Sequence, residues 1–184
     1  MKYFQQIANS IDVIPLALAL QRNSDLWGQN TERKTAEQSP HTQMDDIWIR
    51  WRVKEELTSK EKYNEPHFAE WYPAYYKLPQ LRAIIYGLMA RVEAVHLGGV
   101  LLTKIPPGGE IAPHADAGWH PEFYNTKVYV PVQTNPGVLN IVRNETVVMR
   151  GGDAWVFNNT VTHSVKNHGQ DDRITLIVCM RCEE

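Results

Sequence analysis

The chain of 184 residues is 43% hydrophobic and 22% charged, close to the average for soluble globular proteins, which indicates one folded domain. Its 19 Lys and Arg against 21 Asp and Glu give a net charge of −2, so there is no global positive field and we expect no nucleic-acid partner. The two cysteines, Cys179 and Cys182, are too few for a disulfide framework and favour a cytoplasmic protein.

The first half, residues 1–94, reads as a helical and irregular extension. The apolar run Val13–Leu20 is too short to span a bilayer, so we expect no membrane segment. Because proline suits the first turn of a helix, Pro15 predicts a buried helix that ends near Asn23. The polar residues 29–45 then predict a long loop.

Three further elements are predicted before the sequence pattern changes. Residues Ile47–Trp51 are β-branched and aromatic, which is typical of a strand. The charged run Glu55–Lys62 predicts a solvated turn or short helix. Residues 79–93 carry apolar side chains on one helical face and predict the clearest helix of the chain. The tryptophans of the first half are expected to support the fold and to help close a substrate pocket.

After Val95 the hydrophobic period becomes two, and turn residues recur at the short intervals typical of an antiparallel sandwich or barrel. We therefore predict a mainly β fold with some α, in which residues 95–184 form a double-stranded β-helix (a cupin-like jelly roll) and the N-terminal helices pack on it. The predicted strands are Val95–Ile105, Ile111–Ala115, Thr126–Gln133, Leu139–Val142, Thr146–Met149, Ala154–Asn158, Thr162–Lys166 and Arg173–Met180.

Two histidines and an aspartate in the β half form a candidate metal site. His114 and Asp116 are two positions apart at the end of a strand, so they share one face, and His163 lies on a later strand. Two neutral imidazoles and one carboxylate can occupy one triangular face of an octahedral metal ion, as in non-heme Fe(II) oxygenases. We therefore predict that these three residues bind a metal and form the catalytic centre.

Arg173 and Thr175 share one face of the last predicted strand and are candidates for binding a co-substrate. A facial metal triad leaves positions for a chelating molecule such as 2-oxoglutarate, whose distal carboxylate then needs a fixed cation inside the barrel. The planar fork of arginine pairs with a carboxylate through two hydrogen bonds, and a threonine hydroxyl can add a third.

Four stretches of the β half resemble a known family. Pro113–Asp116, Phe157–His163 and Arg173–Thr175 resemble the signature of Fe(II)/2-oxoglutarate-dependent dioxygenases. Asn125–Pro131 is similar to a run found in the aspartyl/asparaginyl β-hydroxylase-like branch of that superfamily. The resemblance covers about residues 95–184 and agrees with the predicted jelly roll.

The resemblance implies a role for each candidate residue. His114, Asp116 and His163 would bind Fe(II), and Arg173 and Thr175 would hold 2-oxoglutarate. The implied activity is hydroxylation of a C–H bond of a protein side chain or a small amino-acid-like substrate, with release of succinate and carbon dioxide.

Two positions depart from the pattern of the family. Better-known animal members of the branch lack a carboxylate at the Asp116 position, and related halogenases replace it with a small residue that admits halide. With Asp116 present, the expected reaction is hydroxylation. Lys127 stands where the branch often has an arginine, and we expect its ammonium to help neutralise the co-substrate without a bidentate contact.

Several other residues keep two interpretations at this point. Trp119, His120 and Tyr124 follow the metal motif and either line the mouth of a pocket or pack as ordinary loop residues. Asn159 precedes the distal histidine and either forms a turn or contacts the metal ligands. His41 and His67, both in a polar context, are interpreted as surface residues rather than ligands.

Two alternatives to a hydroxylase stay open. One is a cupin-like metal-binding protein with a non-oxidative or ligand-sensing role, which would use the same metal ligands. The other is a structural β domain without a metal. The position of Arg173, ten residues after His163, favours the oxygenase because a cupin without 2-oxoglutarate has no need of that cation.

Overall fold

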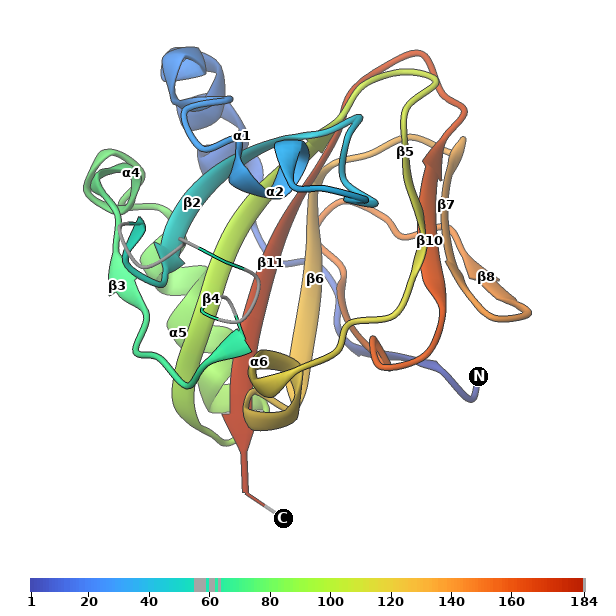
Figure 1. Cartoon of the computed structure of the whole chain (residues 1–184). Helices are drawn as coiled ribbons and strands as arrows, with labels where there is room; N and C mark the ends of the chain where they lie inside the picture. Colours follow the sequence, from blue (N-terminus) through green and yellow to red (C-terminus); the bar gives the residue numbers. More distant parts are fainter. Residues whose placement is uncertain (55–58, 60–61, 63, 184) are drawn as a thin grey trace.

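The computed structural model describes the chain except residues 55–58, 60–61, 63 and 184, so most of the charged run predicted at Glu55–Lys62 lies outside the described residues. Two antiparallel sheets face each other, and helices cover the outer face of the larger sheet (Figure 1). The predicted fold class, mainly β with a jelly-roll core, is confirmed.

The larger sheet has the strand order β1–β9–β6–β11–β4–β2–β3 among the described residues. The long strand β11 pairs with β4 on one side and β6 on the other, which places Thr175 opposite Thr103 and Pro131. The strands are β1 Phe4–Ala8, β2 Asp45–Trp51, β3 Glu70–Trp71, β4 Ala94–Ile105, β6 Thr126–Gln133, β9 Ala154–Phe157 and β11 Arg173–Cys182.

The smaller sheet has the order β5–β10–β7–β8 within the part of the chain that the structure describes. Its register places His163, the first residue of β10, opposite His114, the last residue of β5. Two predicted ligands from distant parts of the sequence therefore lie side by side. The strands are β5 Glu110–His114, β7 Val138–Val142, β8 Glu145–Val147 and β10 His163–Asn167.

Two helices, α1 (Ile14–Arg22) and α5 (Leu81–Arg91), contribute buried leucines such as Leu16 and Leu88 to the core on the outer face of the larger sheet. Pro15 lies in the first turn of α1, as the sequence predicts. None of the described helices has the length and apolar character needed to cross a membrane. The shorter helices are a 3-10 helix at Ser24–Leu26, α2 Glu32–Thr35, α4 Pro73–Lys77 and α6 Trp119–Phe123.

Strand β11 shows how the larger sheet separates two cores. Leu176 and Val178 point to the helices and join the outer core. Ile177 and Cys179 point to the smaller sheet and join an inner core that also contains the aromatic residues Trp48, Trp51, Tyr129 and Phe157. Because side chains alternate along a strand, Arg173 and Thr175 share the inner face with Ile177. The alternation therefore directs both predicted co-substrate residues into the barrel.

The predicted strands of the β half all form, with ends that differ by at most two residues. Three elements of the first half differ from the prediction. Strand β1 was not predicted, and neither was β3, although both belong to the larger sheet. The predicted loop 29–45 contains the short helix α2.

Two glycine substitutions of the same chemistry are expected to have opposite effects on stability. A Cβ atom at Gly99 on β4 would overlap the ring of Trp51, whereas one at Gly87 in α5 meets nothing within 4 Å. Gly99→Ala should therefore lower the free energy of unfolding by about 2 kcal/mol, and Gly87→Ala should raise it by up to about 1 kcal/mol. Urea unfolding of both variants measures this, and equal effects would contradict the described packing of Trp51.

Candidate metal centre

His114 and His163 are held by backbone carbonyl groups in the same way. Nδ1 of His114 lies 2.8 Å from the carbonyl oxygen of Ala112, and Nδ1 of His163 lies 3.0 Å from that of Val161. Because a carbonyl can only accept, each ring carries its proton on Nδ1 and keeps the lone pair of Nε2 available. The two rings are 4.2 Å apart between centroids. The local backbone thus sets both imidazoles in the tautomer that a metal requires.

Asp116 brings a carboxylate oxygen to the two imidazoles. Its backbone N–H donates to the carbonyl oxygen of Asn159 at 2.9 Å, which ties the loop after β5 to the loop before β10. Its Oδ1 lies 3.5 Å from Nε2 of His114 and 3.9 Å from Nε2 of His163. The three potential ligand atoms lie within 4.8 Å of one another. The structure therefore brings the predicted triad together.

The second oxygen of Asp116 is already fully engaged by the protein. Lys127 Nζ donates to Oδ2 at 2.7 Å, and Asn159 Nδ2 donates to the same oxygen at 2.8 Å. These contacts orient the carboxylate and leave Oδ1 facing the histidines. Asn159 thus contacts a metal-ligand candidate, which is the second of the two interpretations that the sequence left open. The contact of Lys127 with a co-substrate stays a prediction, whereas its bond to Asp116 was not expected from the sequence.

The protonation states suit metal binding. Burial raises the pKa of the Asp116 carboxyl, but the Lys127 charge and the hydrogen bonds outweigh this and hold the pKa well below its usual range. Burial, followed by the charge of Lys127, lowers the pKa of His163 to about 4. Nε2 of His163 is also buried without a hydrogen-bond partner among the described residues. A buried, deprotonated nitrogen of this kind fits a metal ion.

Arg173 and Thr175 form a second polar group inside the barrel. Arg173 is 1% exposed, and its Nη1 donates to Thr103 Oγ1 at 3.1 Å. Its Nη2 and the hydroxyl of Thr175 are buried and have no hydrogen-bond partner within the described part of the chain. Burial lowers the pKa of Arg173 to about 10, so the guanidinium is still charged at neutral pH. A buried cation with unused donors fits a carboxylate ligand.

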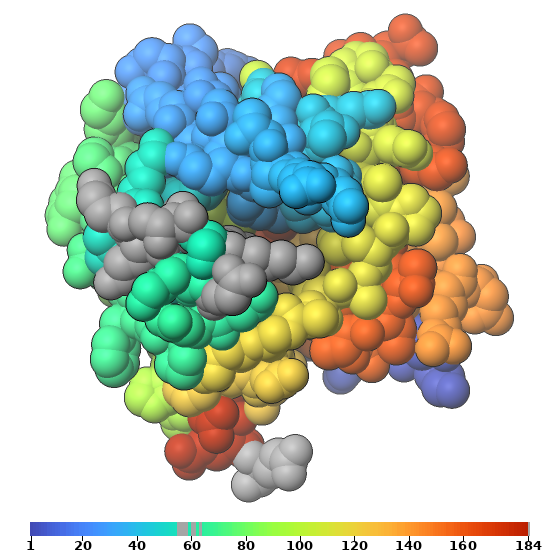
Figure 2. All heavy atoms as spheres, viewed as in Figure 1, coloured from blue at the N-terminus to red at the C-terminus, as the bar shows by residue number. Residues whose placement is uncertain are grey.

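The N-terminal segment 29–44 covers the side of the barrel next to β5. Pro40 accepts a hydrogen bond from the backbone of Ala112 at 3.0 Å, and Gln43 accepts one from Glu110 at 3.0 Å. Figure 1 shows the segment, in blue to cyan, crossing in front of the larger sheet towards β5. Figure 2 shows its surface meeting the yellow surface of residues 110–123. The segment is therefore part of the wall around the candidate centre.

His41, at the end of this segment, is not a surface residue, and that prediction is wrong. Its ring packs edge-on against the ring of His114 with 5.0 Å between centroids. Burial, followed by the charge of Arg33, holds the pKa of His41 well below its usual range. The polar neighbours of His41 in the sequence gave no signal for this position, because its burial depends on contacts with β5.

Aromatic residues after the metal motif pack closely against one another and against Trp51. The ring of His120 lies 5.0 Å from Trp51 and 4.9 Å from Tyr124. Trp119 lies 5.0 Å from the ring of His67, which is partly exposed, so the interpretation of His67 as a surface residue is not contradicted. Burial, followed by the charge of His67, lowers the pKa of His120 to about 3. The ring contacts favour the packing interpretation, and a contact with a substrate stays a prediction.

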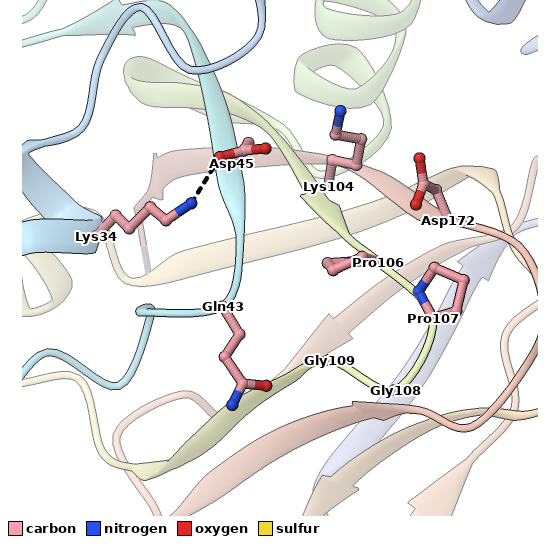
Figure 3. A pocket seen from close by; sticks show the side chains of 9 residues that line it. All are labelled: Lys34, Gln43, Asp45, Lys104, Pro106, Pro107, Gly108, Gly109 and Asp172. Atoms are coloured by element: carbon pink, nitrogen blue, oxygen red, sulfur yellow. Dashed lines mark hydrogen bonds and ion pairs between the residues drawn. The ribbon is translucent and has the colours of Figure 1, made fainter.

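A separate surface pocket of about 460 Å³ lies where the segment 29–44 meets the end of β4 (Figure 3). Lys34 and Asp45 form an ion pair of 2.9 Å on its wall, and Lys104 lies over the ring of Trp27. None of the predicted site residues lines this pocket. One pair of its charges, Lys34 and Asp45, is therefore neutralised within the protein, and the predicted histidine–aspartate group lies outside this pocket.

A sequence model of the aspartyl/asparaginyl beta-hydroxylase family matches residues 18–181. The chain belongs to this family. It is therefore an oxidoreductase, a hydroxylase of the 2-oxoglutarate- and Fe(II)-dependent oxygenase type, which confirms the resemblance seen in the sequence. The family match also extends into the first half of the chain, which the resemblance in the β half did not include. Among curated proteins, no sequence relative matches the chain.

Solved structures of low sequence identity share the fold of this beta-hydroxylase family member. The viral collagen prolyl hydroxylase of Paramecium Bursaria Chlorella virus-1 is 10% identical, with a TM-score of 0.53 over 99% of this chain and 97% of that chain. A Pseudomonas putida prolyl-4-hydroxylase is 16% identical, with a TM-score of 0.51 over 98% and 93%. A 2OG-Fe(II) oxygenase family oxidoreductase from Burkholderia pseudomallei is 12% identical, with a TM-score of 0.53 over 74% and 67%.

Proposed function

We propose that the protein uses Fe(II) and 2-oxoglutarate to hydroxylate a C–H bond of a protein side chain or a small amino-acid-like substrate, with release of succinate and carbon dioxide. The proposal is carried by the convergence of His114 Nε2, His163 Nε2 and Asp116 Oδ1, all within 4.8 Å of one another. We also propose that it acts in the cytoplasm and has no nucleic-acid partner, as the composition favours.

Each residue of the centre has a defined task in this proposal. His114, His163 and Asp116 hold the iron, which when bound supplies the oxidising chemistry. Arg173 and Thr175 bind the distal carboxylate of 2-oxoglutarate through the buried donors that the protein leaves unused. The inner core around these residues excludes water from the reaction.

The family and the similar structures support a class of substrate. The family name specifies aspartyl and asparaginyl side chains, and two of the similar structures are prolyl hydroxylases. All three are amino-acid residues, so we propose an amino-acid side chain, free or within a peptide, as the substrate. It would approach the centre past α6, whose first residues, Trp119 and His120, follow the loop of Asp116 in the chain.

The test of this function is a screen for substrate-stimulated turnover. The protein is loaded with Fe(II) under anaerobic conditions, mixed with 2-oxoglutarate and a panel of N-acetylated amino-acid amides and free amino acids, and then exposed to oxygen. Succinate formation that rises with one member of the panel, together with a mass increase of one oxygen atom in that member, is expected. Tight iron binding without any succinate from any member would instead favour the cupin-like alternative.

Replacing Lys127 tests how the protein holds Asp116. Lys127→Met keeps the length of the side chain but removes the bond to Oδ2, so the carboxylate is less well oriented. Loss of such an outer contact typically weakens metal affinity about 10- to 100-fold, and we expect a loss in that range by chelator competition.

The matched control is Lys166→Met, because Lys166 is partly exposed on β10 and its contact with Glu110 is a distant 3.7 Å. It should leave iron affinity unchanged. If Lys127→Met keeps the iron affinity but weakens 2-oxoglutarate binding, Lys127 serves the co-substrate directly and the positioning role is wrong.

A further inference from the structure

His41 carries an unused hydrogen-bond donor next to the metal centre. Its Nδ1 is buried and has no hydrogen-bond partner among the described residues, and its Nε2 lies 3.1 Å from Nη2 of Arg33. Because a guanidinium can only donate, Nε2 is the acceptor and the proton of the neutral ring lies on Nδ1. The ring lies against His114, a metal-ligand candidate. His41 therefore offers an N–H group beside the centre.

The position of this donor is fixed by a buried ion pair. Nη1 of Arg33 donates to Oδ2 of Asp46 at 2.9 Å, and the two side chains are 12% and 3% exposed. Asp46 lies on β2 and is paired with Thr103 of β4, so the larger sheet anchors the guanidinium. The backbone bond between Pro40 and Ala112 holds the segment from the other side. The tautomer and the place of the His41 ring are thus both determined by the fold.

The chemistry of the co-substrate supplies an acceptor for this donor. A 2-oxoglutarate that chelates a metal through its keto oxygen and one carboxylate oxygen keeps the second oxygen of that carboxylate free. Lys127 and Asn159 already donate to Asp116, and Arg173 is the cation for the distal carboxylate. Among the donors described around the centre, Nδ1 of His41 is the one that is both unused and in contact with a metal-ligand ring.

We propose that His41 binds the metal-proximal carboxylate of 2-oxoglutarate by donating from Nδ1, with Arg33 and Asp46 as positioning residues. The inference rests on the proposed function and extends it to the N-terminal segment, which becomes part of the co-substrate site. Two ends of one molecule are then recognised separately: the proximal carboxylate by His41 and the metal, and the distal carboxylate by Arg173 and Thr175.

Binding of two ligands, 2-oxoglutarate and oxalate, distinguishes the site of the proximal carboxylate from that of the distal carboxylate without any turnover. Oxalate carries the metal-proximal half of 2-oxoglutarate and lacks the distal carboxylate. Binding of each to the anaerobic Fe(II)-loaded protein is measured by titration calorimetry. His41→Leu should weaken both ligands about tenfold, since one hydrogen bond to a charged group is lost. His41→Asn, which has the same branched arrangement of heavy atoms as leucine but an N–H close to the Nδ1 position, should stay within about threefold of wild type.

The controls distinguish this proposal from its alternatives. Arg173→Met should weaken 2-oxoglutarate but leave oxalate unchanged, and His168→Leu, at an exposed turn residue, should change neither. His41→Phe, which keeps a ring against His114, is a second variant without the donor if the leucine variant unfolds. Unchanged affinity for both ligands in the donor-free variants, or a loss for 2-oxoglutarate alone, would overturn the proposal. Wild-type protein that binds iron but neither ligand would contradict the proposed function as well.

Discussion

His163→Ala is expected to abolish iron binding at micromolar metal and with it the formation of succinate. The side chain supplies one of the three ligand atoms, and its Nε2 is buried with no hydrogen-bond partner among the described residues. Loss of an outer contact typically weakens a metal site about 10- to 100-fold, so the loss of a ligand should exceed 100-fold. Anaerobic equilibrium dialysis with Fe(II) measures the affinity directly.

The control for this variant is His168→Ala, which removes an exposed histidine from a turn a few residues further along the chain. It should bind iron as the wild type does. Thermal unfolding of both variants in the presence of a chelator separates a loss of metal from a loss of fold. A His163→Ala protein that is folded and still binds one iron per chain with unchanged affinity would show that the metal lies elsewhere.

Arg173→Met should produce opposite changes in co-substrate binding and in stability. Removing the guanidinium leaves the distal carboxylate of 2-oxoglutarate without its cation, and the loss of one partner of a buried charged pair weakens binding about 100-fold or more. The ligand-free protein, however, no longer buries a cation whose Nη2 has no described partner. Its free energy of unfolding should rise by about 1 kcal/mol.

Arg173→Lys serves as the matched variant, because lysine keeps the charge but lacks the planar fork. We expect 2-oxoglutarate affinity between that of wild type and Arg173→Met. Titration calorimetry and urea unfolding of the three proteins give both quantities. If Arg173→Met binds 2-oxoglutarate as tightly as wild type, the distal carboxylate is bound by other residues.

The β half could be predicted from the sequence because its strands alternate and end at turn residues. Strand β11 is the clearest case: every second residue from Ile174 is apolar and reaches the outer core. Strand β1 gave no such signal. Its central residues Gln5 and Gln6 are exposed, and the strand forms only because β9 offers a free edge to pair with. Such pairing depends on the assembled sheet and is not visible in a five-residue segment.

The triad could also be predicted, since a histidine and an aspartate two positions apart on a strand must share a face. Its supporting contacts could not. Lys127 was expected near the co-substrate, but whether its ammonium reaches Asp116 depends on how β6 faces the loop after β5. The polar neighbours Ser39, Thr42 and Gln43 predict a surface position for His41. Its burial arises from a contact with β5 about seventy residues away in the sequence.

The central claim is that one iron ion at His114, Asp116 and His163 presents 2-oxoglutarate to the buried Arg173. The most direct measurement is an anaerobic titration of the Fe(II)-loaded protein with 2-oxoglutarate, followed by the visible metal-to-ligand charge-transfer absorption of the chelate. We predict a band that saturates at one 2-oxoglutarate per iron, disappears in His163→Ala and needs much higher 2-oxoglutarate in Arg173→Met. A wild-type protein with one bound iron and no such band at any 2-oxoglutarate concentration would contradict the claim.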